Sequence, residues 1–147
     1  MAVKNSIPSQ LHNSVSQNFR FTTAHSTNLQ TVFTNPAGEE KETQIRSILI
    51  NNLETSTRIV HFYINNGTDD FFIGSSNVVP VFASPLPGRS EVIAGLTSPL
   101  LNRVLIDEKG NPFLRILPGE VLKARLSAAV TVNNNVIMSV TGSNFER

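Results

Sequence analysis

The chain has 147 residues, a length typical of one domain or of one domain with a tail. Its 12 Lys and Arg residues against 11 Asp and Glu give a formal net charge of +1, so it lacks the basic excess of most nucleic-acid-binding domains. The absence of cysteine excludes disulfides and Cys-ligated zinc sites. No apolar run approaches the roughly 20 residues that a membrane-spanning helix needs, so neither direct nucleic-acid binding nor membrane contact is expected.

The composition favours β-structure over helices. The chain contains 16 Asn, 15 Ser and 12 Thr residues, and only 16% of its residues are charged. Asn and Ser favour turns, whereas Thr, Val and Ile favour strands. Long exposed helices would need more Ala, Glu and Lys than this chain contains.

Residues 1–28 differ from the rest of the chain. They carry two formal charges, Lys4 and Arg20, and their apolar residues show no sustained period of 2 or 3.6. This pattern predicts an extended or flexible N-terminal arm, either disordered or ordered against a neighbouring subunit. In the second case Phe19, Arg20 and Phe21 are the expected partner contacts, because aromatic residues and Arg are enriched at interfaces.

The first predicted strands follow this arm. Residues 29–34 and 43–52 are strand candidates, and in the second Ile45 and Leu49 are expected on one face and Ile48 and Ile50 on the other. Residues 57–64 (TRIVHFYI) form the strongest candidate. This run is β-branched and aromatic and is apolar on both faces, which indicates a central strand.

The rest of the chain also reads as short strands. The candidates are 71–73, 78–82, 90–96, 99–106, 113–117, 121–128, 129–132 and 136–142. In 121–128, Leu122, Ala124 and Leu126 form the expected buried face. Short strands at spacings near ten residues predict an all-β chain, with residues 29–147 as a single antiparallel β-sandwich or jelly-roll-like domain.

No catalytic or ligand motif is found. The sequence has no GxxxxGK[ST], GxGxxG, GxSxG or HExxH pattern, and its three histidines, His12, His25 and His61, do not share a metal-binding spacing. Catalytic, cofactor-binding and metal residues are therefore all expected to be absent. His61 lies inside the strongest strand and is at most a pH sensor.

Three weaker alternatives remain open. A glycan hydrolase would need two carboxyl groups about 5–10 Å apart, and Asp69 or Asp70 with Asp107 is the pair to test. A binding site for a host-surface glycan could lie in the loop 65–90 with Phe71 and Phe72, although tryptophan is absent. Residues 65–70 could bind a cation weakly through oxygen ligands.

Two segments resemble a known class of proteins. The run TVFTNPAGEEKETQIRSILINNLETSTRIVHFYI (31–64) resembles the opening of small β-sandwich virion proteins of tailed bacteriophages, with a T-x-[YF]-T-x-P-A-G turn leading into an I-x-S-I-x-[VI]-x-N strand. The run ILPGEVLKARLSAAVTVNNNVIMSVTGSNFE (116–146) is similar to the L-x-P-G-[DE]-x-[IL]-x-A-x-x-S-A ending of such proteins. The resemblance covers residues 31–146, and its middle part matches poorly.

The resemblance implies a non-enzymatic structural protein of the virion, assembled in the cytoplasm of the bacterial host. The first expectation is a capsid decoration (cement) protein that binds the major capsid protein as a homo-oligomer, with a trimer favoured, and stabilises the shell. The alternative is a neck, collar or tail component that binds other virion subunits, with a possible role in host-surface binding. Copy number per particle distinguishes the two.

Overall fold

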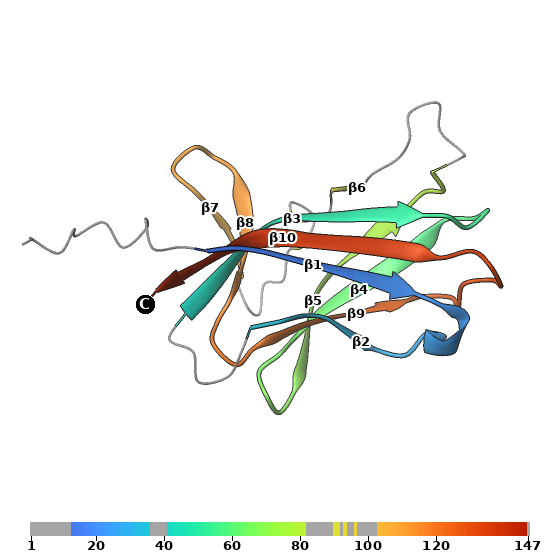
Figure 1. Cartoon of the computed structure of the whole chain (residues 1–147), viewed down its shortest axis with the longest axis horizontal. Helices are drawn as coiled ribbons and strands as arrows, with labels where there is room; N and C mark the ends of the chain where they lie inside the picture. The colour runs from blue at the N-terminus through green and yellow to red at the C-terminus, as the bar shows by residue number, and fades with distance from the viewer. Residues whose placement is uncertain are drawn as a thin grey trace, which may run out of the picture.

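The computed structural model describes residues 13–35, 41–81, 90–91, 93, 96 and 103–146. These residues form an all-β structure in which two antiparallel sheets pack face to face (Figure 1). The β-sandwich predicted from the sequence is confirmed. A single turn of 3-10 helix, η2 (Thr23–His25), follows the first strand.

One sheet has six strands, and five of them follow the order β1-β10-β3-β8-β7. Their bounds are β1 (Asn13–Phe21), β10 (Val136–Glu146), β3 (Lys41–Asn52), β8 (Pro112–Ile116) and β7 (Val104–Ile106). The two-residue strand β6 (Ser90–Glu91) also pairs with β3. Strands β1 and β10, from opposite ends of the chain, thus lie side by side (Figure 1).

The other sheet has four strands in the order β2-β9-β4-β5. Their bounds are β2 (Gln30–Thr34), β9 (Val121–Leu126), β4 (Arg58–Asn65) and β5 (Asp70–Val78). Strand β4, the strongest strand in the sequence, lies between β9 and β5, so its predicted central place is confirmed.

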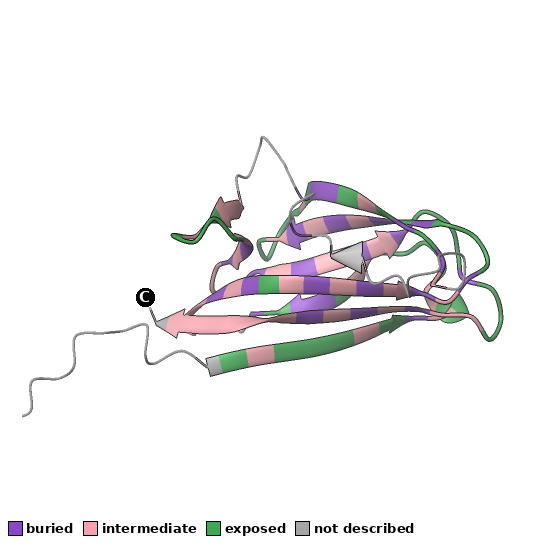
Figure 2. Cartoon of the chain, turned by 90° about the horizontal axis from the view of Figure 1, so that it is seen from above, coloured by how far each residue is buried: buried purple, intermediate pink, exposed green. Residues whose placement is uncertain are grey.

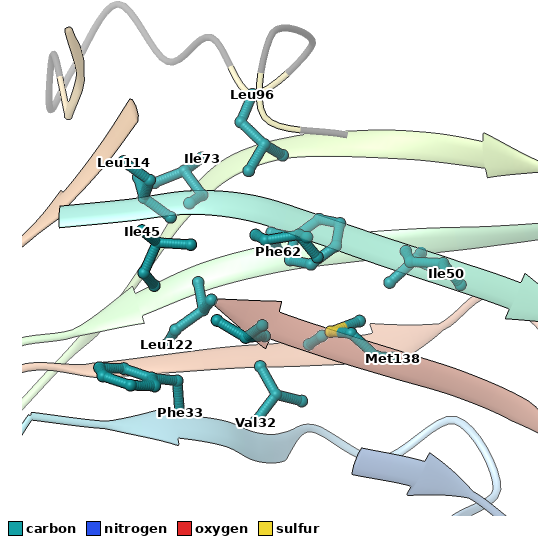
Figure 3. Close-up of a cluster of buried hydrophobic side chains, with 14 of the residues drawn as sticks. Val32, Phe33, Ile45, Ile50, Phe62, Ile73, Leu96, Leu114, Leu122 and Met138 are labelled. Atoms are coloured by element: carbon teal, nitrogen blue, oxygen red, sulfur yellow. The ribbon is translucent and has the colours of Figure 1, made fainter. Parts of the chain in front are cut away.

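The core fills the space between the sheets with large apolar side chains. Phe33, Phe62 and Leu122 of the four-stranded sheet face Ile45, Ile50 and Met138 of the six-stranded sheet (Figure 3). The predicted buried face of β9, Leu122, Ala124 and Leu126, is at most 1% exposed. Phe62, Ile45 and Leu114 are fully buried, as expected of close-packed interior side chains.

A β-bulge changes the facing of side chains along β3. Ser47 pairs with Thr141 of β10, but Gly142 pairs with Ile45, so Arg46 is an extra residue on β3. The bulge brings Ile45 onto the same buried face as Ile48, whereas Arg46 is exposed. The prediction that Ile45 shares a face with Leu49 is therefore wrong, because strict alternation does not continue across a bulge.

Gly142 is required for the close approach of β10 to β3 at this bulge. A Cβ atom at residue 142 would lie 2.2 Å from the Gln44 carbonyl oxygen and 2.8 Å from the Ile45 Cα. We expect Gly142→Ala to destabilise the fold by about 1–3 kcal/mol, the usual cost of overpacking. Urea unfolding of this variant beside Ser143→Ala measures the effect, and equal stability of the two would contradict the close approach.

The segment expected to be an arm contributes a strand to the sandwich. Residues 13–21 pair with β10 along their whole length, and the Phe21 side chain is fully buried in the core. Residues 1–12 lie outside the described residues. The division of the chain into an arm at 1–28 and a domain at 29–147 stays a prediction, but the sandwich includes β1.

Two other expected elements differ or cannot be compared. Residues 129–132 form no strand, because the chain turns between β9 and β10 there. Most of the strand candidates at 90–96 and 99–106 lies outside the described residues, apart from β6 and β7. The jelly-roll connection likewise stays a prediction.

A buried ion pair joins two loops at one end of the sandwich. Glu54, in the β3–β4 loop, accepts hydrogen bonds from the backbone N–H and the hydroxyl of Thr131, in the β9–β10 loop. An Arg58 Nη lies 3.5 Å from Glu54 Oε2 and donates to the Ala129 carbonyl at 3.2 Å. Asn52, also buried, accepts from the Glu54 N–H at 2.9 Å. The two carboxylate oxygens of Glu54 thus fix both loops.

Candidate functional site

The outer face of the four-stranded sheet carries an unusual set of side chains. Successive residues of a strand face opposite sides, so burial of Val60, Phe62 and Ile64 directs His61 and Tyr63 outward. Both of these rings are half-buried. No second layer of the described chain covers this face.

Strand register places five outward side chains together. Tyr63 pairs with Lys123 of β9 and Phe72 of β5, and His61 pairs with Arg125 of β9. A second bulge, between Phe62 and Tyr63, shifts the β4–β5 register by one residue at this point. We call His61, Tyr63, Phe72, Lys123 and Arg125 the aromatic–basic patch.

The rings of this patch contact one another. The centroids of Tyr63 and Phe72 lie 5.5 Å apart in an edge-to-face arrangement, and those of His61 and Phe72 lie 6.2 Å apart. Arg125 Nε donates a hydrogen bond to the Tyr63 hydroxyl oxygen at 3.2 Å. Phe72 remains 49% exposed, a large fraction for an aromatic side chain. Exposed rings held in place by their neighbours bind a partner with little loss of side-chain entropy.

The charge of the patch is positive. Lys123 Nζ lies 3.3 Å from Asp70 Oδ1, a surface ion pair of little energetic value. Arg125 forms no ion pair with any described residue. A guanidinium beside exposed rings is suited to a partner's carboxylate, because Arg binds carboxylates in a bidentate geometry.

His61 has a lowered pKa in this setting. Partial burial of the ring disfavours the imidazolium and lowers the pKa below the ordinary 6.5, and the charge of Arg125 lowers it further. The His61 ring Nδ1 also lies 2.6 Å from the Ser75 hydroxyl. We expect NMR titration to give His61 a pKa below 6.5, and Arg125→Gln to raise it, while the distant Arg20→Gln leaves it unchanged.

The lowered pKa of His61 makes the stability of the fold depend on pH. Between the unfolded pKa and the lower folded pKa, the unfolded chain binds more protons, so the His61 contribution to stability is lost as pH falls through that window. A His61 pKa unaffected by Arg125→Gln would mean that the two charges do not interact.

A second exposed feature is the β7–β8 hairpin loop, in which the carboxylate of Asp107 is bound by groups of its own chain. Hydrogen bonds from the backbone N–H of Asn111, then of Lys109, and from the Arg46 guanidinium hold the pKa of Asp107 below its ordinary value. Arg46 Nη1 lies 2.7 Å from Asp107 Oδ2 and its guanidinium lies over the Phe113 ring at 4.6 Å. Arg46 and Asp107, which both line the shallow groove between this loop and β3, are thus bound to each other.

The predicted partner residues have different environments. Phe21 is fully buried, and Phe19 is half-buried with its centroid 4.8 Å from that of Phe21 and 5.2 Å from that of His25. Arg20 faces outward from β1 and is exposed. The two rings therefore contact their own chain in this structure, and the partner role of all three stays a prediction.

The carboxylates considered for hydrolysis are engaged separately. Asp70 is at the start of β5 beside Lys123, whereas Asp107 is in the β7–β8 loop of the other sheet and is bound by Arg46. Within the described residues, no group of three or more His, Asp or Glu side chains could hold a metal ion. In the 65–70 loop, the side-chain oxygens of Asn65 and Asn66 accept backbone N–H groups of the loop itself, which stabilises the turn.

The sequence contains a signal for the patch that strand prediction alone does not use. Strand 57–64 is apolar on both faces, which is typical of a strand covered on both sides. Among the residues that the structure describes, only the inner side of this strand is covered by other parts of the chain. Exposed apolar surface of this kind is typical of interaction sites.

Comparisons with known proteins give the following. No protein-family model and no curated protein matches the chain. A solved chain from the acidic stable capsid structure of Helicobacter pylori bacteriophage KHP30 is similar over 91% of this chain and 94% of its own length, with a TM-score of 0.47 and 12% identity. In the described part of the chain, no helix has the length and apolarity to cross a membrane.

Proposed function

We propose that this chain is a non-enzymatic structural protein of a bacteriophage virion, a capsid decoration protein that binds the major capsid protein as a homo-oligomer. The observation that supports a binding role most directly is the aromatic–basic patch. Tyr, Phe and Arg are enriched at protein interfaces, and here they lie together on a rigid sheet. The virion assignment draws on the resemblance of residues 31–64 and 116–146 to small phage β-sandwich proteins.

The mechanism is the addition of buried interface to the shell. Phe72 and Tyr63 would lose their exposed area against a capsid subunit, and Arg125 would bind one of its carboxylates. A ligand that binds only the assembled shell stabilises it by about 2.7 kcal/mol at a hundred times its Kd. Many copies at equivalent sites multiply this contribution over the particle.

The decisive experiment compares a patch variant with a matched control in particle binding. Phe72→Ser removes an exposed ring from the patch, and Val132→Ser changes another exposed apolar residue, 74% exposed, in the β9–β10 loop. We expect Phe72→Ser to weaken binding to undecorated particles by about tenfold or more and Val132→Ser to leave it unchanged. Equal binding of both variants would remove the patch from the capsid contact.

One observation favours a second candidate. The exposed ring of Phe72, in edge-to-face contact with the half-buried ring of Tyr63, also suits stacking against a sugar, which would fit a neck or tail component that binds the host surface. Quantitative mass spectrometry of purified particles separates the two. A ratio near one per capsid subunit supports decoration, a few copies per hundred supports the neck or tail, and absence from particles contradicts both.

A further inference from the structure

Strand β1 is held to the sandwich by one neighbouring strand. It lies at the edge of the six-stranded sheet, and among the described strands it pairs with β10 alone, from Asn13 opposite Asn144 to Phe21 opposite Val136. Along β1 only Phe21 is fully buried, with Val15 and Phe19 packed against the core from its margin. Figure 2 shows the strand as largely exposed along its length. The site that holds β1 therefore consists of the edge of β10, with which it pairs, and the space in the core that the Phe21 ring fills.

The segment after β1 packs against the strand up to residue 25. The Thr22 N–H donates to His25 Nδ1 at 3.0 Å, and the His25 ring lies against the rings of Phe19 and Phe21. This compact turn thus packs on β1 itself. None of residues 22–29 is buried, so no core contact ties the connection to the rest of the sandwich.

The connection is strained at the residue that follows. Ser26 has φ 49° and ψ −126°, and the Asn28 N–H donates to the His25 carbonyl at 3.0 Å. These values describe a four-residue turn of type II′ with Ser26 at the first central position, which glycine normally occupies. A side chain at a positive φ is unfavourable there, and an extended conformation of Ser26 would remove the strain.

We propose that β1 exchanges between copies of this chain, with residues 26–29 as the hinge. In the exchanged form β1 of one copy pairs with β10 of the next, and its Phe21 fills the core of that copy. The docking site is already complementary, because every copy has the same β10 edge and the same cavity. Strain in a short hinge favours this arrangement over the closed chain.

The geometry of the hinge permits this exchange. Four extended residues span about 13 Å, enough to direct β1 away from its own β10 edge. Reciprocal exchange gives a dimer and cyclic exchange gives a trimer or larger ring. In either case Phe19, Arg20 and Phe21 lie against a second copy. The proposal concerns the isolated chain, so it holds or fails independently of the virion role.

Disulfide trapping tests the exchange directly, because the natural sequence contains no cysteine. Asn18 of β1 and Ser139 of β10 are directly opposite each other. Two chains that differ in mass by a tag, one with Asn18→Cys and one with Ser139→Cys, are refolded together and oxidised. We expect a cross-linked pair of unequal chains on a non-reducing gel.

The matched control uses a strand pair that the hinge cannot exchange. Ser47 of β3 and Thr141 of β10 are also opposite each other, so Ser47→Cys mixed with Thr141→Cys should give no cross-link between chains. A single chain that carries both Asn18→Cys and Ser139→Cys tests whether β1 instead pairs with β10 of its own copy. If its disulfide closes within single chains, and the mixed chains stay unlinked, β1 docks on its own copy and the proposal is wrong.

The hinge is tested by relieving its strain. Ser26→Gly permits the positive φ without a Cβ, so we expect it to raise the ratio of monomer to oligomer, measured by light scattering after size exclusion, by about fivefold or more. Thr27→Gly adds the same flexibility to the next residue without changing Ser26. Equal ratios for the two variants would contradict the role of Ser26 in the exchange.

Discussion

Replacing Glu54 by alanine is expected to destabilise the fold by about 3–5 kcal/mol, the range typical of breaking a buried ion pair. The Glu54 side chain is 1% exposed and that of Arg58 is 9% exposed. Without the carboxylate, the Arg58 guanidinium stays buried beside the Ala129 carbonyl with no counter-charge, and both donors of Thr131 lose their acceptor. A loss of this size would leave a typical domain only marginally stable. Chemical denaturation at neutral pH measures it.

Two further variants show where this cost arises. Glu108→Ala removes an exposed carboxylate in the β7–β8 loop and should change stability by less than about 0.5 kcal/mol. The double change Glu54→Ala with Arg58→Met removes both charges, so it should cost less than Glu54→Ala alone. A double variant less stable than the single one would show that the loss comes from packing and not from an unpaired charge.

Much of the sandwich could be predicted from the sequence, because burial on one face of a strand produces strict alternation. Leu122, Ala124 and Leu126 alternate with polar residues, and all three are buried. Strict alternation could not predict which side chains of β3 are buried. The extra residue Arg46 reverses the alternation, and the close approach of the strands at this point requires Gly142, which is far away in sequence.

The strand at the N-terminus shows a second limit. Val15, Phe19 and Phe21 do recur with a period of two, but Gln17 interrupts the apolar series, and the outward residues are as polar as those of a disordered segment. An edge strand needs only a few apolar side chains because one face packs and one edge pairs. Composition alone cannot separate such a strand from an arm.

Part of the candidate site could also be predicted from the sequence. The apolar character of residues 57–64 on both faces predicts that β4 is central in its sheet, and the sequence also indicates Phe72 as a candidate for glycan contact. Sequence could not place Lys123 and Arg125 beside Tyr63 and His61, because that neighbourhood depends on the antiparallel register between β4 and β9. Register follows from which faces are buried and not from a local motif.

Replacing Phe21 by alanine is the second change with a large expected effect, about 3–5 kcal/mol of stability. The ring is fully buried, and its removal leaves a cavity at the end of β1 and takes away the edge-to-face contact with Phe19. The loss is expected whether Phe21 fills the core of its own copy or of a second one. In the exchanged form the midpoint of unfolding also depends on protein concentration.

Arg20→Ala is the matched control, because Arg20 is adjacent on the same strand and faces outward. Its expected effect on unfolding is less than about 0.5 kcal/mol. If Phe21→Ala changed the stability as little as Arg20→Ala, residues 13–21 would not be part of the core in solution. The segment would then be an arm that does not pack on the sandwich. A large loss of stability for Phe21→Ala alone would instead show that β1 is a strand of the sandwich. A neighbouring subunit could then contact β1 only through the outward face of the strand, or after the whole strand has left its own copy.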